Sequence, residues 1–347
     1  MSLLNLNRAH EQWYRGHLAV WLLAPLALLF YVISALRRLC YKVGLKKAYQ
    51  ADFPVIVVGN ISVGGNGKTP VVLALADYYV KRGVKVGILS RGYGGSSTHF
   101  PRRVSANDSA SEVGDEPRLL AARSQSIVVI DPIRARGAAY LVEQCNCELI
   151  ICDDGLQHYA LVRDVELVVM DDRKVGSGFL LPMGPLREGM WRMNNVDAII
   201  HNSNNIPTFE NPVAPQFLMT LVPDEFVNVT TGEKASVDVI RNVPCSAIAG
   251  IGAPQRFFNQ LKAMGIPLQS QHPLPDHHAL SEGDIPKGRV LMTEKDAVKA
   301  APLAHSDCWY LPVTAKISDD FYNLINAKLT SIDLARCETK RNKQHGL

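Results

Sequence analysis

The stretch GNISVGGNGKTP (59–70) decides the fold of this chain, because it ends in Gly-Lys-Thr (67–69), the end of a phosphate-binding loop. An apolar, β-branched segment (54–60) precedes it, and a segment with helical character (69–83) follows. Strand, glycine-rich loop and helix in this order form the setting that the motif requires. Counting back through the pattern G-x-x-x-x-G-K-[ST] places Ser62 where a glycine is expected. The sequence therefore predicts a phosphate loop with one departure.

The glycines of this loop would let backbone N–H groups turn toward phosphate oxygens. Lys68 would reach the terminal phosphates as a point charge, and the Thr69 hydroxyl would ligate Mg²⁺. A glycine-rich turn that binds no nucleotide is the alternative. The residues predicted to hold the nucleotide are Ser62, Val63, Gly64, Gly65, Asn66, Gly67, Lys68 and Thr69.

Apolar segments that are typical of buried strands recur along the chain and end in polar residues, at 126–130, 147–154, 165–172 and 196–204. Because helical stretches separate such strands, we expect an α/β fold with a mostly parallel sheet and right-handed crossovers, like that of P-loop NTPases. Ligands gather at the carboxyl ends of the strands in such sheets, which is where the polar residues lie here.

The chain is expected to form several consecutive parts. Two strands around a turn at Pro223-Asp224 predict a β-hairpin linker, and strand–loop–helix patterns after it predict a second, smaller α/β domain. The predicted parts are an N-terminal membrane anchor helix with a basic juxtamembrane segment (1–47), the P-loop core domain (48–205), the β-hairpin linker (206–236), the smaller C-terminal α/β domain (237–335) and a tail (336–347).

The N-terminal segment LAVWLLAPLALLFYVISAL (18–36) contains no charged residue and is long enough to cross a bilayer of about 30 Å as a helix. Five cations follow within 37–47, against Arg8 and Arg15 before it, which places its C-terminal side in the cytoplasm. A cleaved signal peptide is one alternative. Pro25 also allows a broken helix that lies in the membrane interface, and whether the segment spans or lies there stays open.

Composition narrows the possible partners. The net charge of +4, without a long run of one sign, argues against nucleic acid as the main partner. The seven cysteines, scattered from Cys40 to Cys337, make a poor disulfide framework and favour a reducing compartment. A metal site at the cysteines of 145–152 is disfavoured because they supply too few ligands.

Further motifs carry charged side chains that suit phosphate chemistry. Asp153-Asp154 follows a predicted strand and fits a carboxylate near a metal, although the pair could instead cap a helix. Asp115-Glu116 in VGDEP could equally be an ordinary surface pair. Arg187 suits phosphate oxygens, but exposed arginine is usually solvated. In LPDHHAL (274–280), Asp276 and two histidines predict a metal site or, more simply, a histidine paired with a carboxylate.

Eight motifs together resemble one family. They are GNISVGGNGKTP (59–70), LSRGYGG (89–95), VGDEP (113–117), DDGLQH (153–158), PMGPLREG (182–189), IAGIGAPQRFF (248–258), PDHHALS (275–281) and MTEKDAVK (292–299). In this order they resemble the tetraacyldisaccharide 4′-kinase family of lipid A biosynthesis, from the N-terminal anchor to about residue 330. The Ser62 variant of the loop is similar to that family's own form.

The resemblance implies an activity and roles for particular residues. Such enzymes use ATP and Mg²⁺ to phosphorylate the 4′-hydroxyl of a tetraacylated glucosamine disaccharide 1-phosphate, which forms lipid IVA. It implies Asp115 as the catalytic base with His277 as its partner across a domain cleft, although the adjacent His278 leaves that assignment open. The other implied residues are Lys68 and Arg187 in catalysis, Thr69, Glu116, Asp153 and Asp154 at the metal, and Tyr93, Gln157, His158 and Glu188 near the nucleotide.

The resemblance also implies a location. A membrane-embedded glycolipid substrate places the enzyme at the inner membrane, in contact with its lipids and with the catalytic domains on the cytoplasmic face. We expect no nucleic acid and no obligate protein partner. The alternatives are a membrane-associated P-loop ATPase and a nucleotide-dependent switch acting on a protein partner.

Overall fold

The computed structural model describes residues 13–209, 214–276 and 278–344. Arg8 and His277, both used in the predictions above, lie outside these residues. Contacts divide the chain into two compact units that interleave along the sequence. The first unit comprises Met1–Lys68, Arg134–Thr220 and Ile317–Leu347, and the second comprises Thr69–Ile133 and Leu221–Lys316.

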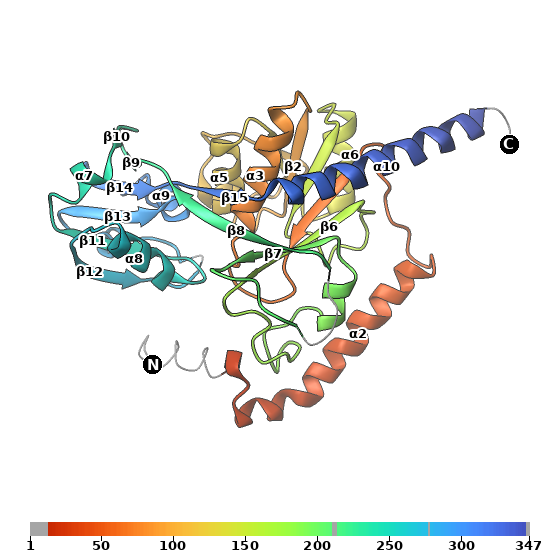
Figure 1. Ribbon diagram of the computed structural model, residues 1–347, viewed down its shortest axis with the longest axis horizontal. Coiled ribbons are helices and arrows are strands. Elements are labelled where there is room, and N and C mark those ends of the chain that lie inside the picture. The colour runs from red at the N-terminus through yellow and green to blue at the C-terminus, as the bar shows by residue number, and fades with distance from the viewer. Residues whose placement is uncertain (1–12, 210–213, 277, 345–347) are drawn as a thin grey trace. The chain divides into compact units, whose positions relative to one another are not determined.

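The first unit is built on a parallel sheet with the strand order β8-β7-β6-β1-β5 (Figure 1). Almost every residue of the four strands β7, β6, β1 and β5 is buried, so the sequence shows continuous apolar runs instead of alternation. The strands are β1 (Val55–Gly59), β5 (Leu149–Asp153), β6 (Val165–Asp171), β7 (Ala198–Asn202) and β8 (Gln216–Pro223). The helices α6 (Arg134–Glu143) and α10 (Asp319–Gln344) belong to this unit, and α10 packs against β6.

The second unit contains a helix-flanked group of strands and a separate six-stranded sheet. In the group, β2 (Val86–Ser90) runs parallel to β4 (Ile127–Ile130), and β3 (Arg102–Val104) is antiparallel to β4. Its helices are α3 (Lys68–Val80), α4 (Ala110–Val113) and α5 (Asp115–Arg123).

The six-stranded sheet has the order β10-β9-β14-β13-β11-β12. Its strands are β9 (Phe226–Asn228), β10 (Lys234–Ala235), β11 (Cys245–Ala249), β12 (Leu268–Pro273), β13 (Arg289–Thr293) and β14 (Cys308–Leu311). Its helices are α7 (Val237–Ile240), α8 (Pro254–Ala263), η3 (Glu282–Asp284) and α9 (Glu294–Ala300), and α9 packs against α5. Strand β15 (Val313–Ile317) then leads the chain into α10.

The prediction of a hairpin around Pro223-Asp224 is wrong, because the two strands on either side of this turn do not pair with each other. Both strands exist, as β8 and β9 on either side of Asp224, but β8 pairs in parallel with β7, whereas β9 pairs with β10 and β14. Each strand thus completes a different sheet, a long-range outcome that local turn residues do not encode. The boundaries of the predicted consecutive domains stay a prediction, because the two units are made of segments that alternate along the sequence.

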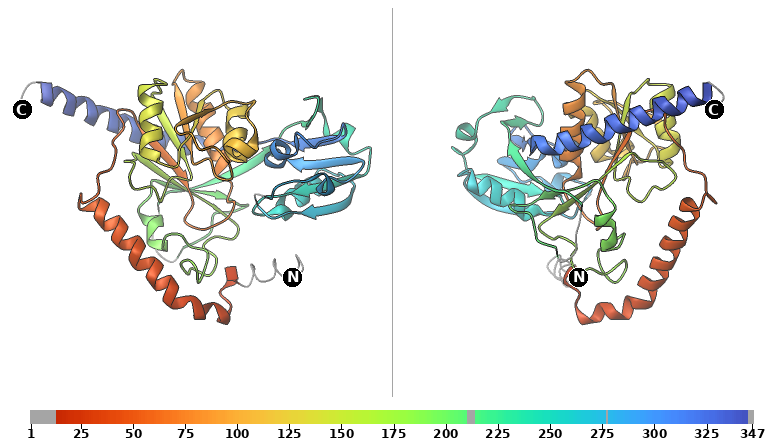
Figure 2. Two further views of the ribbon diagram at one scale, coloured as in Figure 1. Left: turned by 180° about the vertical axis from the view of Figure 1, so that it is seen from behind. Right: turned by 45° about the vertical axis from the view of Figure 1, so that its right-hand side comes forward.

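The N-terminal apolar segment forms a short 3-10 helix, η1 (Leu18–Leu23), and then α2 (Ala24–Lys42). Pro25 lies in the first turn of α2, where a missing N–H is tolerated, so the helix begins there instead of running on from η1. Residues Leu18–Lys42 are long and apolar enough to cross a membrane by length and composition alone. Most large side chains of α2 are exposed, and Figure 2 shows the helix lying apart from the strands of its own unit.

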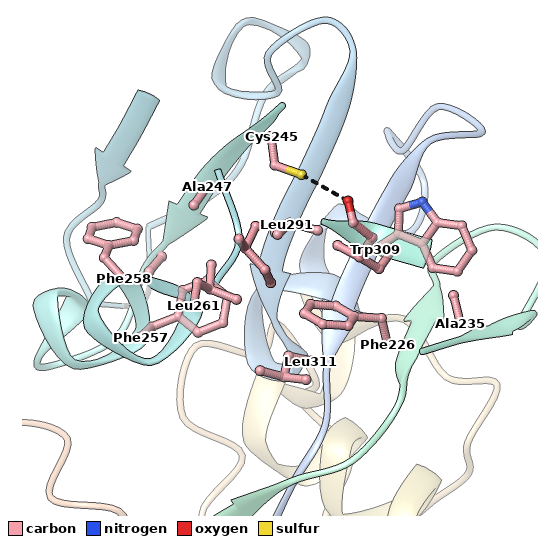
Figure 3. Packing of buried hydrophobic residues seen from close by; sticks show 13 residues of the cluster. Phe226, Ala235, Cys245, Ala247, Phe257, Phe258, Leu261, Leu291, Trp309 and Leu311 are labelled. Carbon is pink, nitrogen blue, oxygen red and sulfur yellow. Dashed lines mark hydrogen bonds between the residues drawn. The ribbon is translucent and has the colours of Figure 1, made fainter. Parts of the chain in front are cut away.

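The six-stranded sheet has its own apolar core (Figure 3). Phe226, Phe258, Leu261 and Leu311 are buried between the sheet and its helices, beside Trp309. Burial raises the pKa of the Cys245 thiol in this cluster to about 11, so it packs as a small apolar side chain.

We expect Phe258→Ala to lower the free energy of unfolding by about 3–5 kcal/mol, because the ring is fully buried and its loss leaves a cavity. The measurement is denaturant unfolding of the detergent-solubilised chain, followed by tryptophan fluorescence. Val239→Ala is the matched control, since this α7 side chain is about half exposed and should cost less than about 0.5 kcal/mol. A Phe258 effect no larger than that of the control would contradict the packing.

Candidate active site

The loop between β1 and α3 requires glycine at two positions. Gly64 and Gly67 have φ values of +99° and +90°, in the left-handed region that other residues rarely adopt. A Cβ at Gly64 would lie 2.9 Å from Nη1 of Arg173, and one at Gly67 would lie 2.4 Å from Nδ2 of Asn202. The loop therefore has the tight, side-chain-free backbone that a phosphate cradle needs.

The buried amide of Asn66 explains Ser62. Asn66 Nδ2 donates to Ser62 Oγ (3.1 Å) and to the Val169 carbonyl at the end of β6 (3.3 Å). Both side chains are about 1% exposed, so neither can replace this hydrogen bond with bulk water. A glycine at position 62 would leave the amide without its hydroxyl partner. Ser62, which stands where the common pattern has glycine, thus stabilises the loop through a buried hydrogen bond with Asn66.

A second segment lies along the first half of the loop and carries Arg187. The Val63 N–H donates to the Pro185 carbonyl (2.8 Å), and the Arg187 N–H donates to the Ile61 carbonyl (2.7 Å). Two backbone hydrogen bonds therefore fix Arg187 beside the loop.

Lys68, Asp154 and Arg187 come together at the end of β5. Arg187 Nη1 donates to both oxygens of Asp154 (3.2 and 3.0 Å), and Lys68 Nζ lies 3.6 Å from Asp154 Oδ1. Burial alone would raise the pKa of Asp154, but the charges of Lys68 and Arg187 outweigh it and lower the pKa to about 2. The Asp154 carboxylate is thus ionised throughout the physiological pH range. Lys68 and Arg187 carry two positive charges against its one negative charge, so the group has a positive excess.

The neighbouring Asp153 is 1% exposed. Arg134, the first residue of α6 and also fully buried, donates from Nη2 to the Asp153 carbonyl (3.3 Å). The sequence predictions missed Arg134, although its place just after the strand at 127–130 was a signal that could have found it.

Glu188 lies in a buried network instead of at an open surface. It accepts hydrogen bonds from Gln157 Nε2 (3.2 Å) and from the Tyr159 hydroxyl, and its Oε2 lies 3.4 Å from Arg192 Nε. Burial raises the pKa of Tyr159, and the Glu188 charge raises it further, so the phenol stays a donor. Gln157 also donates to the Asn60 carbonyl (3.3 Å), which ties the network to the start of the phosphate loop. Tyr159 and Arg192 were not predicted.

The remaining predicted residues of these motifs occupy turns and a helix start. His158 lies in the turn after β5, where its backbone N–H donates to the Gly155 carbonyl (2.9 Å). Thr69 is the second residue of α3.

In the second unit, Asp115 and Glu116 begin α5, where the helix N-terminus stabilises negative charge. Gly114 before them has φ +93°, and a Cβ there would lie 2.5 Å from the Tyr93 carbonyl. The loop that carries Tyr93 therefore lies against the start of α5, while the Tyr93 side chain is itself exposed.

Lys295 from α9 joins three carboxylates. Its Nζ lies 3.6 Å from Asp115 Oδ2, 3.0 Å from Glu116 Oε1 and 3.1 Å from Asp276 Oδ1. Burial alone would lower the pKa of Lys295, but the three carboxylates outweigh it and raise the pKa. This lysine was not predicted, since it lies far along the chain from Asp115. Two residues after Asp276, His278 Nε2 is 3.4 Å from Asp284 Oδ2, and His277 lies outside the described residues.

Within residues 13–209, 214–276 and 278–344, no three His, Cys, Asp or Glu side chains converge on a metal site. Mg²⁺ usually keeps several waters and is held by one or two carboxylates together with substrate phosphates. Asp154 is an ionised carboxylate that could serve in such a site.

Comparison with known proteins agrees with this geometry. The family model described as LpxK, tetraacyldisaccharide-1-P 4′-kinase, matches residues 19–330. The chain belongs to the tetraacyldisaccharide-1-P 4′-kinase family. It is therefore a kinase, and the family and fold class predicted from the sequence are confirmed.

Relatives of the family match almost end to end. A tetraacyldisaccharide 4′-kinase of Pseudoalteromonas atlantica is 48% identical over 309 residues, covering 89% of this chain and 99% of the relative. One from Colwellia psychrerythraea is 46% identical over 327 residues, covering 90% and 94%. The crystal structure of an "apo" form of LpxK from Aquifex aeolicus in complex with ATP is 30% identical, has a TM-score of 0.77, and covers 90% of this chain and 99% of that one.

We expect Lys295→Met to lower the free energy of unfolding at pH 7.5 by about 3–5 kcal/mol, because it leaves three carboxylates without their shared cation. The raised pKa means that the contribution of Lys295 is fully present below the ordinary lysine value of about 10.4 and is lost only as pH rises through the higher folded value.

The control is Lys81→Met, which removes an exposed pair with Asp77 and should cost less than about 1 kcal/mol. Both variants are compared with the parent chain by thermal and denaturant unfolding at pH 7.5. A Lys295→Met penalty no larger than that of Lys81→Met would contradict the importance of this group of charges.

Proposed function

We propose that this chain transfers the γ-phosphoryl group of ATP to the 4′-hydroxyl of a tetraacyldisaccharide 1-phosphate, with lipid IVA as the product. The observation that carries the proposal is the group formed by Lys68, Arg187 and Asp154 at the end of a glycine-shaped loop. It combines a backbone cradle, a point charge and an arginine fork, which are the parts that phosphoryl transfer needs. The ATP-bound relative and the kinase family support the same assignment.

In this proposal the loop residues 62–69 hold the phosphates of ATP. The N–H groups around Gly64 and Gly67 face the oxygens, while Lys68 and Arg187 neutralise charge on the transferred group. Gln157, His158, Glu188 and Tyr93 are assigned to the surroundings of the nucleotide. Because Glu188 is buried and bonded to Gln157, it acts by orienting the Gln157 amide, not by touching ATP.

Mg²⁺ is assigned to Thr69, Glu116, Asp153 and Asp154, and when bound it supplies positive charge to the phosphate oxygens. Asp154 suits this assignment because its low pKa keeps an ionised oxygen ligand available at any physiological pH.

Asp115 is assigned as the base that accepts the proton of the attacking hydroxyl, with His277 as its partner. A base must be ionised and must lie within about 3 Å of the hydroxyl oxygen. Asp115 begins α5 and has Lys295 Nζ 3.6 Å from Oδ2, and both features favour an ionised carboxylate against the opposing effect of burial, since the side chain is 7% exposed. Such a base contributes about 10²–10⁴-fold to the rate.

We also place the chain at the inner membrane, with its catalytic parts on the cytoplasmic face. The side chains of Leu22, Leu28 and Leu29 are mostly exposed, as are other large apolar residues along Leu18–Lys42. The segment contacts the first unit at both ends, since Trp13 Nε1 donates to the Pro182 carbonyl (2.8 Å) and Arg38 lies 4.7 Å over the Trp191 ring. A helix held at both ends by one folded unit fits the membrane interface better than a full crossing.

Purified protein, [γ-³²P]ATP, Mg²⁺ and detergent-dispersed disaccharide 1-phosphate should give a labelled lipid. We expect Asp115→Asn to lower kcat by about 10²–10⁴-fold with little change in KM for ATP, because the base is lost and the phosphate loop is intact. Asp77→Asn, an exposed carboxylate of α3, is the control and should match the parent chain.

The outcomes of this assay separate the alternatives. Labelled lipid from both the parent chain and Asp115→Asn at equal rates would move the base to another residue. ATP hydrolysis without labelled lipid would overturn the kinase assignment and favour the ATPase.

Replacing two exposed leucines of the Leu18–Lys42 segment, Leu22→Glu in η1 with Leu29→Glu in α2, should reduce binding to vesicles of phosphatidylethanolamine and phosphatidylglycerol by tenfold or more, on the order expected for two charges entering an apolar region. Activity on detergent-dispersed substrate should change little. Val239→Glu, an exposed apolar residue of α7, serves as control. Unchanged flotation of the double variant would show that this surface does not hold the chain on lipid.

A further inference from the structure

Arg173 is held in one orientation by the carboxylate of Asp171. Its Nε donates to both oxygens of Asp171 (3.1 and 2.9 Å), and its Nη2 lies 2.7 Å from Oδ2. The Asp171 side chain is 3% exposed and ends β6, so the pair is fixed to the sheet. Because the planar guanidinium is bound to the carboxylate along its Nε–Nη2 edge, its orientation is fixed.

The same Nη2 that contacts Asp171 also points at the phosphate loop. Arg173 Nη2 donates to the Gly65 carbonyl (3.1 Å) and to Asn66 Oδ1 (2.9 Å). Because guanidinium can only donate, it fixes the amide oxygen of Asn66 toward itself and the amide nitrogen toward Ser62 Oγ. Arg173 therefore sets the orientation of the side chain that holds the loop from inside.

Tyr14, at the base of the membrane anchor, covers this arginine. The Arg173 Cζ lies 5.4 Å from the centre of the Tyr14 ring, within the range of a cation–π contact. Burial raises the pKa of Tyr14, whereas the Arg173 charge and a hydrogen bond with the Ser62 side chain lower it.

The turn after Arg173 is shaped around the same ring. Gly176 has φ +58°, and a Cβ there would lie 2.6 Å from two ring carbons of Tyr14. Beside it, a Cβ at Gly16 would lie 3.0 Å from Ser177 Cβ, and the Trp13 indole donates to the Pro182 carbonyl. The base of the anchor thus packs closely onto the loop that carries Arg173.

We propose that Arg173 is a positioning residue of the phosphate loop and that Tyr14 holds it in place, so that the docking of the anchor segment sets the affinity for ATP. The inference rests on the proposed ATP site and extends it to a residue of the membrane anchor. An undocked anchor releases one face of the guanidinium, loosens its hold on Asn66 and weakens nucleotide binding. Membrane attachment and donor binding are then linked through four side chains: Tyr14, Arg173, Asn66 and Ser62.

The test compares Tyr14→Phe, Tyr14→Leu and Arg173→Gln in detergent. Equilibrium binding of a fluorescent ATP analogue is measured first, with no acceptor lipid present, and KM for ATP and kcat are measured afterwards with detergent-dispersed disaccharide 1-phosphate added. Tyr14→Phe keeps the ring over the guanidinium and should bind within about twofold of the parent chain. Tyr14→Leu and Arg173→Gln should raise Kd and KM for ATP by about tenfold or more, with kcat at saturating ATP changed less than about threefold.

Leu22→Ala is the matched control, because this side chain belongs to the same anchor but is 85% exposed. It should leave the affinity for ATP unchanged. Thermal unfolding of every variant shows whether each one is folded at the assay temperature.

Three results would overturn the link. They are a Tyr14→Leu chain that binds ATP like the parent, a fall in kcat with unchanged affinity for ATP, and a Leu22→Ala effect as large as that of Tyr14→Leu. Because binding is measured without the lipid, a failure to phosphorylate the disaccharide would overturn the proposed reaction while the affinities still decide the link.

Discussion

The phosphate loop of this chain depends on one buried amide. The Asn66 side chain donates to Ser62 and Val169 and accepts from Arg173. The Asn66 backbone carbonyl also accepts from Asn202 Nδ2 (3.3 Å). An amide out of contact with water must keep its partners, since each unmet hydrogen bond costs about 1–3 kcal/mol. The residues around it are thereby constrained, including the serine that replaces a glycine and the arginine that would clash with any side chain at position 64.

The fold brings together two groups of charged side chains, one with an excess of positive charge and one with an excess of negative charge. The group at the end of β5 has two cations for one carboxylate, and the group at the start of α5 has one cation for three carboxylates. The first suits the polyanionic phosphates of a donor. The second suits a proton acceptor and a hard cation, which need ionised oxygens. Each group also neutralises part of its own charge, which limits the cost of keeping it partly buried.

Local patterns predicted the phosphate loop, the parallel strands and most residues near Asp154, because each of these is encoded within a few neighbouring positions. The sequence did not reveal Lys295, Arg173 or the Tyr159–Glu188 contact. Those side chains meet partners from distant segments, and only the completed fold brings them together. The pairing of β8 and β9 was mispredicted for the same reason, since the turn residues between them do not say which sheet each strand joins.

The interleaving of the two units has a consequence for biosynthesis. The chain passes between the units four times, at residues 68–69, 133–134, 220–221 and 316–317. The first unit is complete only when α10 has been made and packs against β6. The apolar segment at 18–42 leaves the ribosome well before the turn at 173–182 on which its base docks. The nascent chain therefore carries this apolar segment without its docking site for more than 100 residues of synthesis, and under the proposed membrane location a lipid surface would cover it during that time.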